Sequence, residues 1–304
     1  MQDDNTLKIE MIDSFSGHRA PIYSLEVGRE PHFIYSAGSD GWVVEWNLLK
    51  PDVGKVMAHI EGSVYCLKLD RSSNIFWVGQ NFEGIHGVQI EDQSRVFSIG
   101  MSKKAIFDIC FWEHQVWVGH DHGMISVIDR EGQQIIKLIK AGDKSARTMC
   151  LVGLDKIAVG FSDGFIRVFN KHFEMESAWL AHELSVFSMI YEDSSHSLIS
   201  VGRDAKIKRW LLNGENTRLV QEVPAHIYAI HDIVMSPDKQ FFATASMDKT
   251  IKIWNVNDLN LLKVIDAPRY GSHKNSVNKL LWSAFQDYLV SASDDKNISI
   301  WKID

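Results

Sequence analysis

A histidine, a hydroxyl side chain and an aspartate recur in this chain at spacings that suit acyl-transfer chemistry. Within residues 225–254, His226 is followed by Thr244 at +18, by Asp248 at +22 and by Trp254 at +28. A hydroxyl nucleophile, a histidine base and an aspartate that orients the base are the parts of a hydrolytic triad. These residues are therefore the first candidates for a catalytic site.

The same residue types occur four times at one spacing, which argues against catalysis. A nucleophile is needed once, in a single cleft with an oxyanion hole. Four matching copies instead indicate an internal repeat, whose polar residues belong to every unit. The four sets are His18, Ser36, Asp40 and Trp46; His182, Ser200, Asp204 and Trp210; His226, Thr244, Asp248 and Trp254; and His273, Ser291, Asp295 and Trp301.

The four residue types can form one hydrogen-bonded chain, from tryptophan through the hydroxyl to histidine and then to aspartate. The hydroxyl and the tryptophan lie in stretches typical of strands, such as 241–244 and 250–254, and the aspartate lies in the polar turn between them. Such a chain satisfies polar groups that a packed sheet would leave without partners, at about 0.5–1.5 kcal/mol per net hydrogen bond. We therefore predict a structural role for all four sets.

The repeat resembles the WD40 family in its Gly-His or Ala-His opening, in its Ser-Ala-Ser-x-Asp-x-x-Ile-x-Ile-Trp ending and in its period. The residue after the tryptophan departs from the family's Trp-Asp pair: it is Asn after Trp46 and Trp254, Leu after Trp210 and Lys after Trp301. That aspartate takes no part in the hydrogen-bonded chain, so its loss does not weaken the assignment. The resemblance covers the whole chain and implies a propeller of four-stranded antiparallel blades.

The period sets the number of blades. His18 and His273 lie 255 positions apart, and six steps over that distance give 42.5 residues a repeat, within the range of a propeller blade. We expect residues 1–304 to form one all-β, seven-bladed propeller domain, with blades starting near 18, 59, 100, 141, 182, 226 and 273. The N-terminal strand, residues 5–13, is expected to pair into the last blade and close the ring. Residues 259–275 are expected to form a loop, because Pro268 and Gly271 break the pattern.

Composition argues against several classes of protein. A net charge of −7, with no long basic run, argues against nucleic-acid binding, because binding to phosphates needs clustered Lys and Arg. Three unpaired cysteines suit a reducing compartment. No window has the roughly 18 apolar residues of a membrane span, and the first residues lack the apolar core of a signal peptide. These features predict a cytoplasmic protein.

A metal site would need ligands at suitable spacing. His120, Asp121 and His122 are candidates, with His114 as a fourth, but no second cluster accompanies them. We expect neither a metal nor a cofactor.

The position after the apolar +4 residue of each repeat is the most informative for binding. By resemblance to WD40 propellers, it lies at the mouth of the central channel, on the face that carries the histidine loops and the aspartate turns. We call this end of the ring the top face, and it is the usual docking surface of the family. Aromatic and arginine side chains are enriched in binding hot spots. Bulky side chains at these positions could equally serve to plug the channel. The positions are Tyr23, Tyr65, Phe107, Arg147, Phe187, His231 and Asn278.

Three further residues belong to the turns of the same face: Trp42, Arg203 and Met247. Trp42 either contacts a partner or packs against a neighbouring loop. Together these positions predict a non-catalytic scaffold that docks a protein or peptide. Two other functions remain open. One is a hydrolase in the central channel. The other is a nucleic-acid-associated scaffold that uses Lys206, Lys208, Arg209, Lys249 and Lys252.

Overall fold

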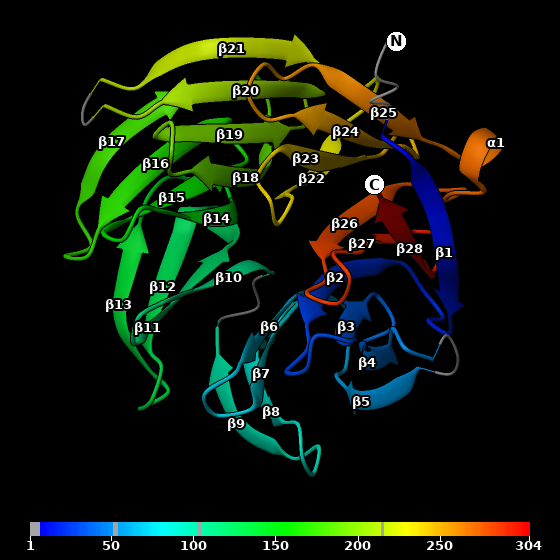
Figure 1. Ribbon diagram of the computed structural model, residues 1–304. Helices are drawn as coiled ribbons and strands as arrows, with labels where there is room; N and C mark the ends of the chain where they lie inside the picture. Colours follow the sequence, from blue (N-terminus) through cyan, green and yellow to red (C-terminus); the bar gives the residue numbers. More distant parts are fainter. Residues whose placement is uncertain (1–6, 51–53, 102–104, 214–215) are drawn as a thin grey trace.

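The computed structural model describes residues 7–50, 54–101, 105–213 and 216–304, which form seven four-stranded antiparallel sheets. The sheets are arranged as blades around a central axis, and the first strand of each blade is innermost (Figure 1). Each inner strand contacts the inner strands of both neighbouring blades, so the ring is closed. The predicted all-β, seven-bladed architecture is confirmed.

In blades one to three, the strands follow one another outward from the central axis in chain order. Blade one holds β2 (Ile22–Val27), β3 (Phe33–Gly38), β4 (Trp42–Asn47) and β5 (Lys55–His59). Blade two holds β6 (Val64–Asp70), β7 (Ile75–Gln80), β8 (Gly84–Gln89) and β9 (Arg95–Gly100). Blade three holds β10 (Ile106–Trp112), β11 (Gln115–His120), β12 (Met124–Asp129) and β13 (Gln134–Lys140), with the 3-10 turn η1 (Asp121–Gly123) between its two middle strands.

Blades four to six repeat the arrangement. Blade four holds β14 (Ala146–Val152), β15 (Lys156–Phe161), β16 (Phe165–Asn170) and β17 (Met175–Leu180). Blade five holds β18 (Val186–Glu192), β19 (Ser197–Gly202), β20 (Lys206–Leu211) and β21 (Arg218–Pro224). Blade six holds β22 (Ile230–Met235), β23 (Phe241–Ser246), β24 (Ile251–Asn255) and β25 (Leu261–Ile265).

Blade seven joins the two ends of the described chain. It holds β26 (Val277–Trp282), β27 (Leu289–Ser293) and β28 (Asn297–Ile303), and its outer strand is β1 (Ile9–Ser16). The register runs from Ile9 opposite Ile303 to Ser16 opposite Asn297. Closure by the N-terminal strand is thus confirmed, but the strand lies further along than 5–13, because Phe15 is also buried and stacks on Trp46. Residues 5 and 6 lie outside the described residues.

The connection from blade six to blade seven corrects the loop expected at 259–275. Its first part is the outer strand β25, and a short helix, α1 (Ala267–Tyr270), follows. The Asp266 carboxylate accepts the Arg269 backbone N–H at 3.0 Å, which caps the first turn of the helix. Gly271 ends the helix in the left-handed conformation (φ 67°). The proline and glycine therefore mark a helix start and stop rather than an irregular loop.

The core lies between blades as much as within them. The second strands are buried on both faces and are nearly continuous apolar runs, whereas outer strands such as β13 are mostly exposed. One cluster joins Tyr35, Val43 and Met57 of blade one to Leu67 and Phe76 of blade two. Within the described residues, no helix has the length and apolar character needed to cross a membrane.

Candidate binding site at the channel mouth

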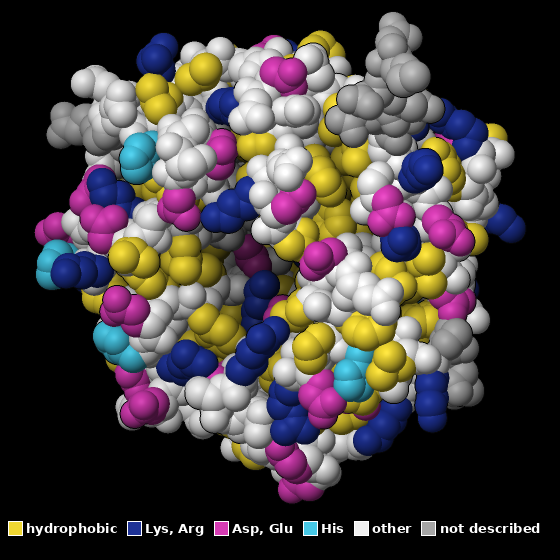
Figure 2. Space-filling model, viewed as in Figure 1, with side chains coloured by type: hydrophobic (Ala, Val, Ile, Leu, Met, Phe, Trp, Pro, Cys, Tyr) yellow, Lys and Arg dark blue, Asp and Glu magenta, His cyan; other side chains and the backbone are white. Residues whose placement is uncertain are grey.

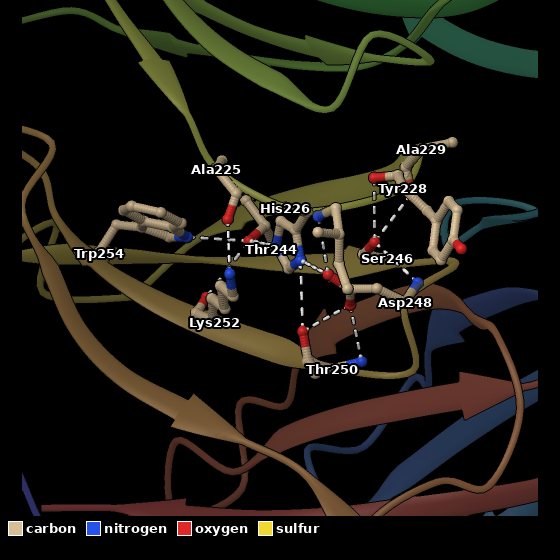
Figure 3. Close-up of polar contacts among 11 residues, drawn as sticks. Ala225, His226, Tyr228, Ala229, Thr244, Ser246, Asp248, Thr250, Lys252 and Trp254 are labelled. Atoms are coloured by element: carbon tan, nitrogen blue, oxygen red, sulfur yellow. Dashed lines mark hydrogen bonds and ion pairs between the residues drawn. The ribbon is translucent and has the colours of Figure 1, made fainter.

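The repeated polar residues of blade six form one continuous hydrogen-bonded chain (Figure 3). The Trp254 indole N–H donates to Thr244 Oγ1 at 2.9 Å, and Thr244 lies 2.8 Å from His226 Nε2. On the other side of the ring, His226 Nδ1 lies 2.8 Å from the Asp248 carboxylate. A neutral imidazole that accepts at Nε2 and donates at Nδ1 satisfies every member of this chain.

The other three copies have the same geometry. The histidine Nδ1 lies 2.9, 2.8 and 3.1 Å from the carboxylate in blades one, five and seven. The histidine Nε2 lies 2.7, 2.8 and 2.8 Å from the serine hydroxyl. Since each hydroxyl also accepts the indole N–H and is fully buried, it has no access to a substrate. The arrangement can hold a turn, but it cannot attack a carbonyl.

The aspartate organises the top turn of each blade. Asp248 accepts hydrogen bonds from the Thr250 backbone N–H at 3.0 Å and from the Thr250 hydroxyl at 2.6 Å. Burial opposes ionisation of Asp248, but these hydrogen bonds and the His226 contact outweigh it and hold the pKa of the carboxyl well below its ordinary value. Burial lowers the pKa of His226 and so favours the neutral imidazole. The Asp248 carboxylate acts in the opposite direction but does not outweigh burial. Burial also opposes ionisation of Asp295, but His273 and the backbone N–H groups of Lys274 and Asn297 outweigh it, and the pKa of Asp295 falls to about 2.

Blades two to four contain different polar contacts in place of this chain. In blade two, His86 lies 2.9 Å from the Ser98 hydroxyl and 3.3 Å from the Gln80 side chain. In blade three, His120 lies 2.8 Å from the Ser126 hydroxyl. In blade four, Arg167 forms an ion pair with Asp163 at 2.8 Å. The repeat pattern does not reveal these contacts, because the partners lie on different strands at other spacings.

The seven mouth positions share a backbone feature that places them. In every inner strand the pairing register shifts just after the first residue, and the residue at that shift is a β-bulge with no partner in the ladder. A bulge changes the direction of its side chain, so two consecutive residues can face the channel. The bulged residues are Tyr23, Tyr65, Phe107, Arg147, Phe187, His231 and Asn278.

These side chains contact one another around the ring. Tyr23 stacks on Tyr65 at 5.3 Å between ring centroids, and Tyr65 approaches Phe107 at 6.0 Å. The Arg147 guanidinium carbon lies 4.0 Å from the Phe107 centroid and 5.2 Å from the Phe187 centroid.

The other half of the ring is polar. Phe187 meets His231 edge-on at 5.7 Å, and His231 Nδ1 lies 3.2 Å from Asn278 Oδ1. Asn278 then donates to the Ile22 carbonyl at 3.0 Å, which returns the contacts to blade one. The mouth is thus lined by a continuous girdle of aromatic and polar groups.

The girdle surrounds a cavity of about 310 Å³, which all seven side chains line. At the other end of the ring, which Figure 2 draws, the centre is also hollowed, and basic, acidic and hydrophobic side chains meet there. The girdle therefore narrows the channel but leaves room for a side chain of a ligand.

A layer of charges lies below the girdle, which the sequence interpretation missed. In the sequence, the inner positions are mostly aromatic, which argues against an enzyme in the channel. In the structure, Glu26, Asp108 and Asp232 also line the channel. Lys68 Nζ lies 3.5 Å from Glu26, and Lys279 Nζ lies 3.0 Å from Asp232. The physical reason is the bulge, after which alternate residues face the channel as well: Asp108 and Asp232 directly follow a bulged residue, and Glu26 lies two residues further along its strand.

The three turn residues of the top face lie apart from the cavity. Trp42 is half-buried, packs against the core between blades one and seven, and lies under the Arg19 guanidinium at 4.7 Å. Arg203 and Met247 are exposed in the turns of blades five and six. None of the three lines the cavity. His122 is exposed and His120 is buried, and within the described ranges no three His, Cys, Asp or Glu residues could hold a metal ion.

Comparison with known proteins gives the fold first. The crystal structure of the WD40 β-propeller domain of Doa1 superposes with a TM-score of 0.83 over 97% of each chain, at 17% sequence identity. The fold and its repeated turn network therefore define a seven-bladed β-propeller. A family model described as "WD domain, G-beta repeat" matches residues 3–47, 217–255 and 267–302. The resemblance to WD40 repeats is thus confirmed in these three regions, and the described residues of the chain have the propeller fold.

Curated relatives are longer than this chain. Human striatin is 22% identical over 282 residues, which cover 82% of this chain and 36% of striatin. Protein hir1 of Schizosaccharomyces pombe is 33% identical over 89 residues, and the polyadenylation factor subunit 2 of Candida albicans is 34% identical over 86 residues. The matches span 9% of hir1 and 15% of the polyadenylation factor subunit, so they compare a small part of each protein with this chain.

Proposed function

We propose that this chain is a non-catalytic interaction scaffold that docks a protein or peptide on its top face, at the channel mouth. The observation that carries the proposal is the girdle, which gathers aromatic rings and an arginine around a cavity. Such side chains supply most of the binding energy in protein interfaces. The girdle side chains also pack on one another, as a channel plug would, but the cavity leaves space that a plug alone does not explain.

An exposed apolar patch on the same face supports docking. Ile227, Tyr228 and Met247 are 80%, 58% and 53% exposed, although they sit at the top of an otherwise polar turn. The patch is held in place, because the Met247 backbone N–H donates to the Ala229 carbonyl at 2.9 Å. Apolar groups fixed at a surface are typical of interaction sites.

The rival functions receive less support from the contacts. A channel hydrolase would need a free carboxylate or histidine, but Glu26 and Asp232 form ion pairs, and Asp108 accepts two backbone N–H groups. Several of the basic residues that would bind nucleic acid also have partners. Lys206 and Lys208 pair with Glu222, Arg209 donates to the Asn257 carbonyl, and Lys252 donates to the Ala225 carbonyl.

Affinity capture tests the docking site. The immobilised chain is compared with a Tyr23→Ala/Phe187→Ala variant and with a matched control, Leu154→Ala/Met175→Ala, which removes two exposed side chains at the opposite end of blade four. Proteins captured by the wild type should be reduced at least about tenfold by the girdle variant, because hot-spot truncations cost more than 1 kcal/mol each. The Leu154→Ala/Met175→Ala control should capture the same proteins as the wild type.

Thermal unfolding must show that the girdle variant is folded. If a folded girdle variant captures the same proteins as the wild type, the docking site is elsewhere. A cytoplasmic location stays a prediction, and it rests on the composition of the chain.

A further inference from the structure

Arg147 places a charge at the mouth of the channel, where no ion pair with another described residue neutralises it. Among the described residues, its guanidinium forms no ion pair and no hydrogen bond, and its contacts are the stacked rings of Phe107 and Phe187. A cation–π contact with an aromatic ring gives the guanidinium N–H donors no oxygen or nitrogen acceptor. Arg147 lines the cavity, so these donors are available to a ligand.

The other cations of the channel already have partners. Lys68 pairs with Glu26, and Lys279 pairs with Asp232. The carboxylate of Asp108 accepts backbone N–H groups at 2.9 and 2.7 Å. Burial lowers the pKa of Arg147, since desolvation disfavours its charge, and the neighbouring Asp121 only partly offsets this effect. A ligand that supplied the missing counter-charge would remove this penalty.

We propose that the ligand anchor is the carboxylate of one aspartate or glutamate side chain, which enters the mouth and accepts hydrogen bonds from Arg147. This inference rests on the proposed docking function and specifies its partner as an acidic peptide segment. Guanidinium and carboxylate form paired, parallel hydrogen bonds, which give both energy and orientation. The girdle rings would hold the guanidinium plane in position for this contact.

The charge layer favours a monoanion. Below the girdle, Lys68 and Lys279 pair with Glu26 and Asp232, so Arg147 is left to balance a ligand's charge, and its one positive charge matches a carboxylate better than a phosphate dianion. A lysine or arginine side chain would meet the Arg147 charge directly. The cavity of about 310 Å³ suits one side chain rather than a folded element.

Peptide pools test the anchor directly, because each pool samples many sequences around one fixed residue. Acetylated, amidated nine-residue pools with a fixed central Glu, Gln, Lys or phosphoserine are immobilised, and binding of the labelled full chain is measured. The Glu pool should retain about tenfold more protein than the Gln pool, the gain expected from a charged hydrogen bond. Added salt should reduce this preference.

Variants assign the preference to Arg147. Arg147→Gln should abolish it, and Arg147→Lys should keep part of it, because an ammonium keeps the charge but loses the forked geometry. The matched control Lys171→Gln removes a cation from the opposite end of blade four and should leave the preference unchanged. Unfolding curves for each variant show whether it is folded.

The outcomes separate the two proposals. The anchor is wrong if the wild type binds the Glu and Gln pools equally, prefers Lys or phosphoserine, binds no pool, or keeps its Glu preference in Arg147→Gln. If Tyr23→Ala/Phe187→Ala then loses pools that the wild type binds without a Glu preference, docking at the mouth stands and the acidic anchor alone fails. If that variant binds every pool as the wild type does, both proposals fail.

Discussion

Asp248→Ala should lower the free energy of unfolding by about 2–4 kcal/mol, whereas Asp121→Ala should lower it by less than about 1 kcal/mol. Both aspartates lie in top turns. The Asp248 side chain is 2% exposed, and its removal leaves His226 and the Thr250 backbone N–H without their acceptor. The Asp121 side chain is 41% exposed, so water can replace it. Urea unfolding of the two variants measures the difference, and equal losses would contradict a structural role for the repeated network.

The pH dependence gives a second test of the same variant. The folded-state pKa of Asp248 lies below the unfolded value of about 4, so its contribution to stability is present above that pH and is lost as the pH falls toward the folded pKa. The stability difference between wild type and Asp248→Ala should therefore be full at pH 7 and should shrink below about pH 4. A difference that grows in acid would show that the carboxylate is not the stabilising form.

Asp232→Ala should be about as damaging, at roughly 3 kcal/mol, although Asp232 belongs to no repeated set. Its carboxylate accepts from the Ser188 hydroxyl at 2.8 Å, from Lys279 Nζ at 3.0 Å and from the Leu280 backbone N–H at 2.9 Å. It therefore joins blades five, six and seven below the girdle. Truncation would leave an ammonium without its carboxylate and a buried N–H without an acceptor.

A double variant separates the ion pair from the rest of the effect. Asp232→Ala/Lys279→Met should be less destabilised than Asp232→Ala, because removal of both partners leaves no Lys279 ammonium without its carboxylate. The control is Asp238→Ala, an exposed turn residue at the other end of blade six, which should cost less than about 1 kcal/mol. If the double variant is the less stable of the two, the pairing does not explain the cost.

The repeated part of the molecule could be predicted from the sequence because each repeat is defined by fixed spacings between residues of one blade. Four copies of one residue pattern specify strand, turn and strand, and the same pattern supplies the period that gives seven blades. The closing strand was misplaced because its apolar pattern is weak, and its position depends on the register opposite Ile303 and on the burial of Phe15. The helix before blade seven was missed because four residues show no periodicity.

The top-face turns also had to be seen in the structure. Trp42 could be an exposed contact or a packed residue by sequence alone, and the structure shows it packed and covered by Arg19. Met247 becomes a candidate contact residue because Ile227 and Tyr228 lie beside it in an exposed apolar patch. Those two residues belong to a loop about twenty residues earlier, so the sequence alone does not bring them together.

The repeated sets of histidine, hydroxyl, aspartate and tryptophan were thus determined by the sequence, since their spacing excludes a single catalytic centre and requires one network in each blade. The binding site was decided by the tertiary structure. A strand read as simple alternation places every second side chain in the channel, whereas the bulge in each inner strand brings two consecutive residues there. Closure of the ring then sets Arg147 between rings from two other blades, and its N–H donors find no partner in the described part of the chain. Each girdle contact joins strands that are distant in sequence, so the sequence pattern does not reveal it.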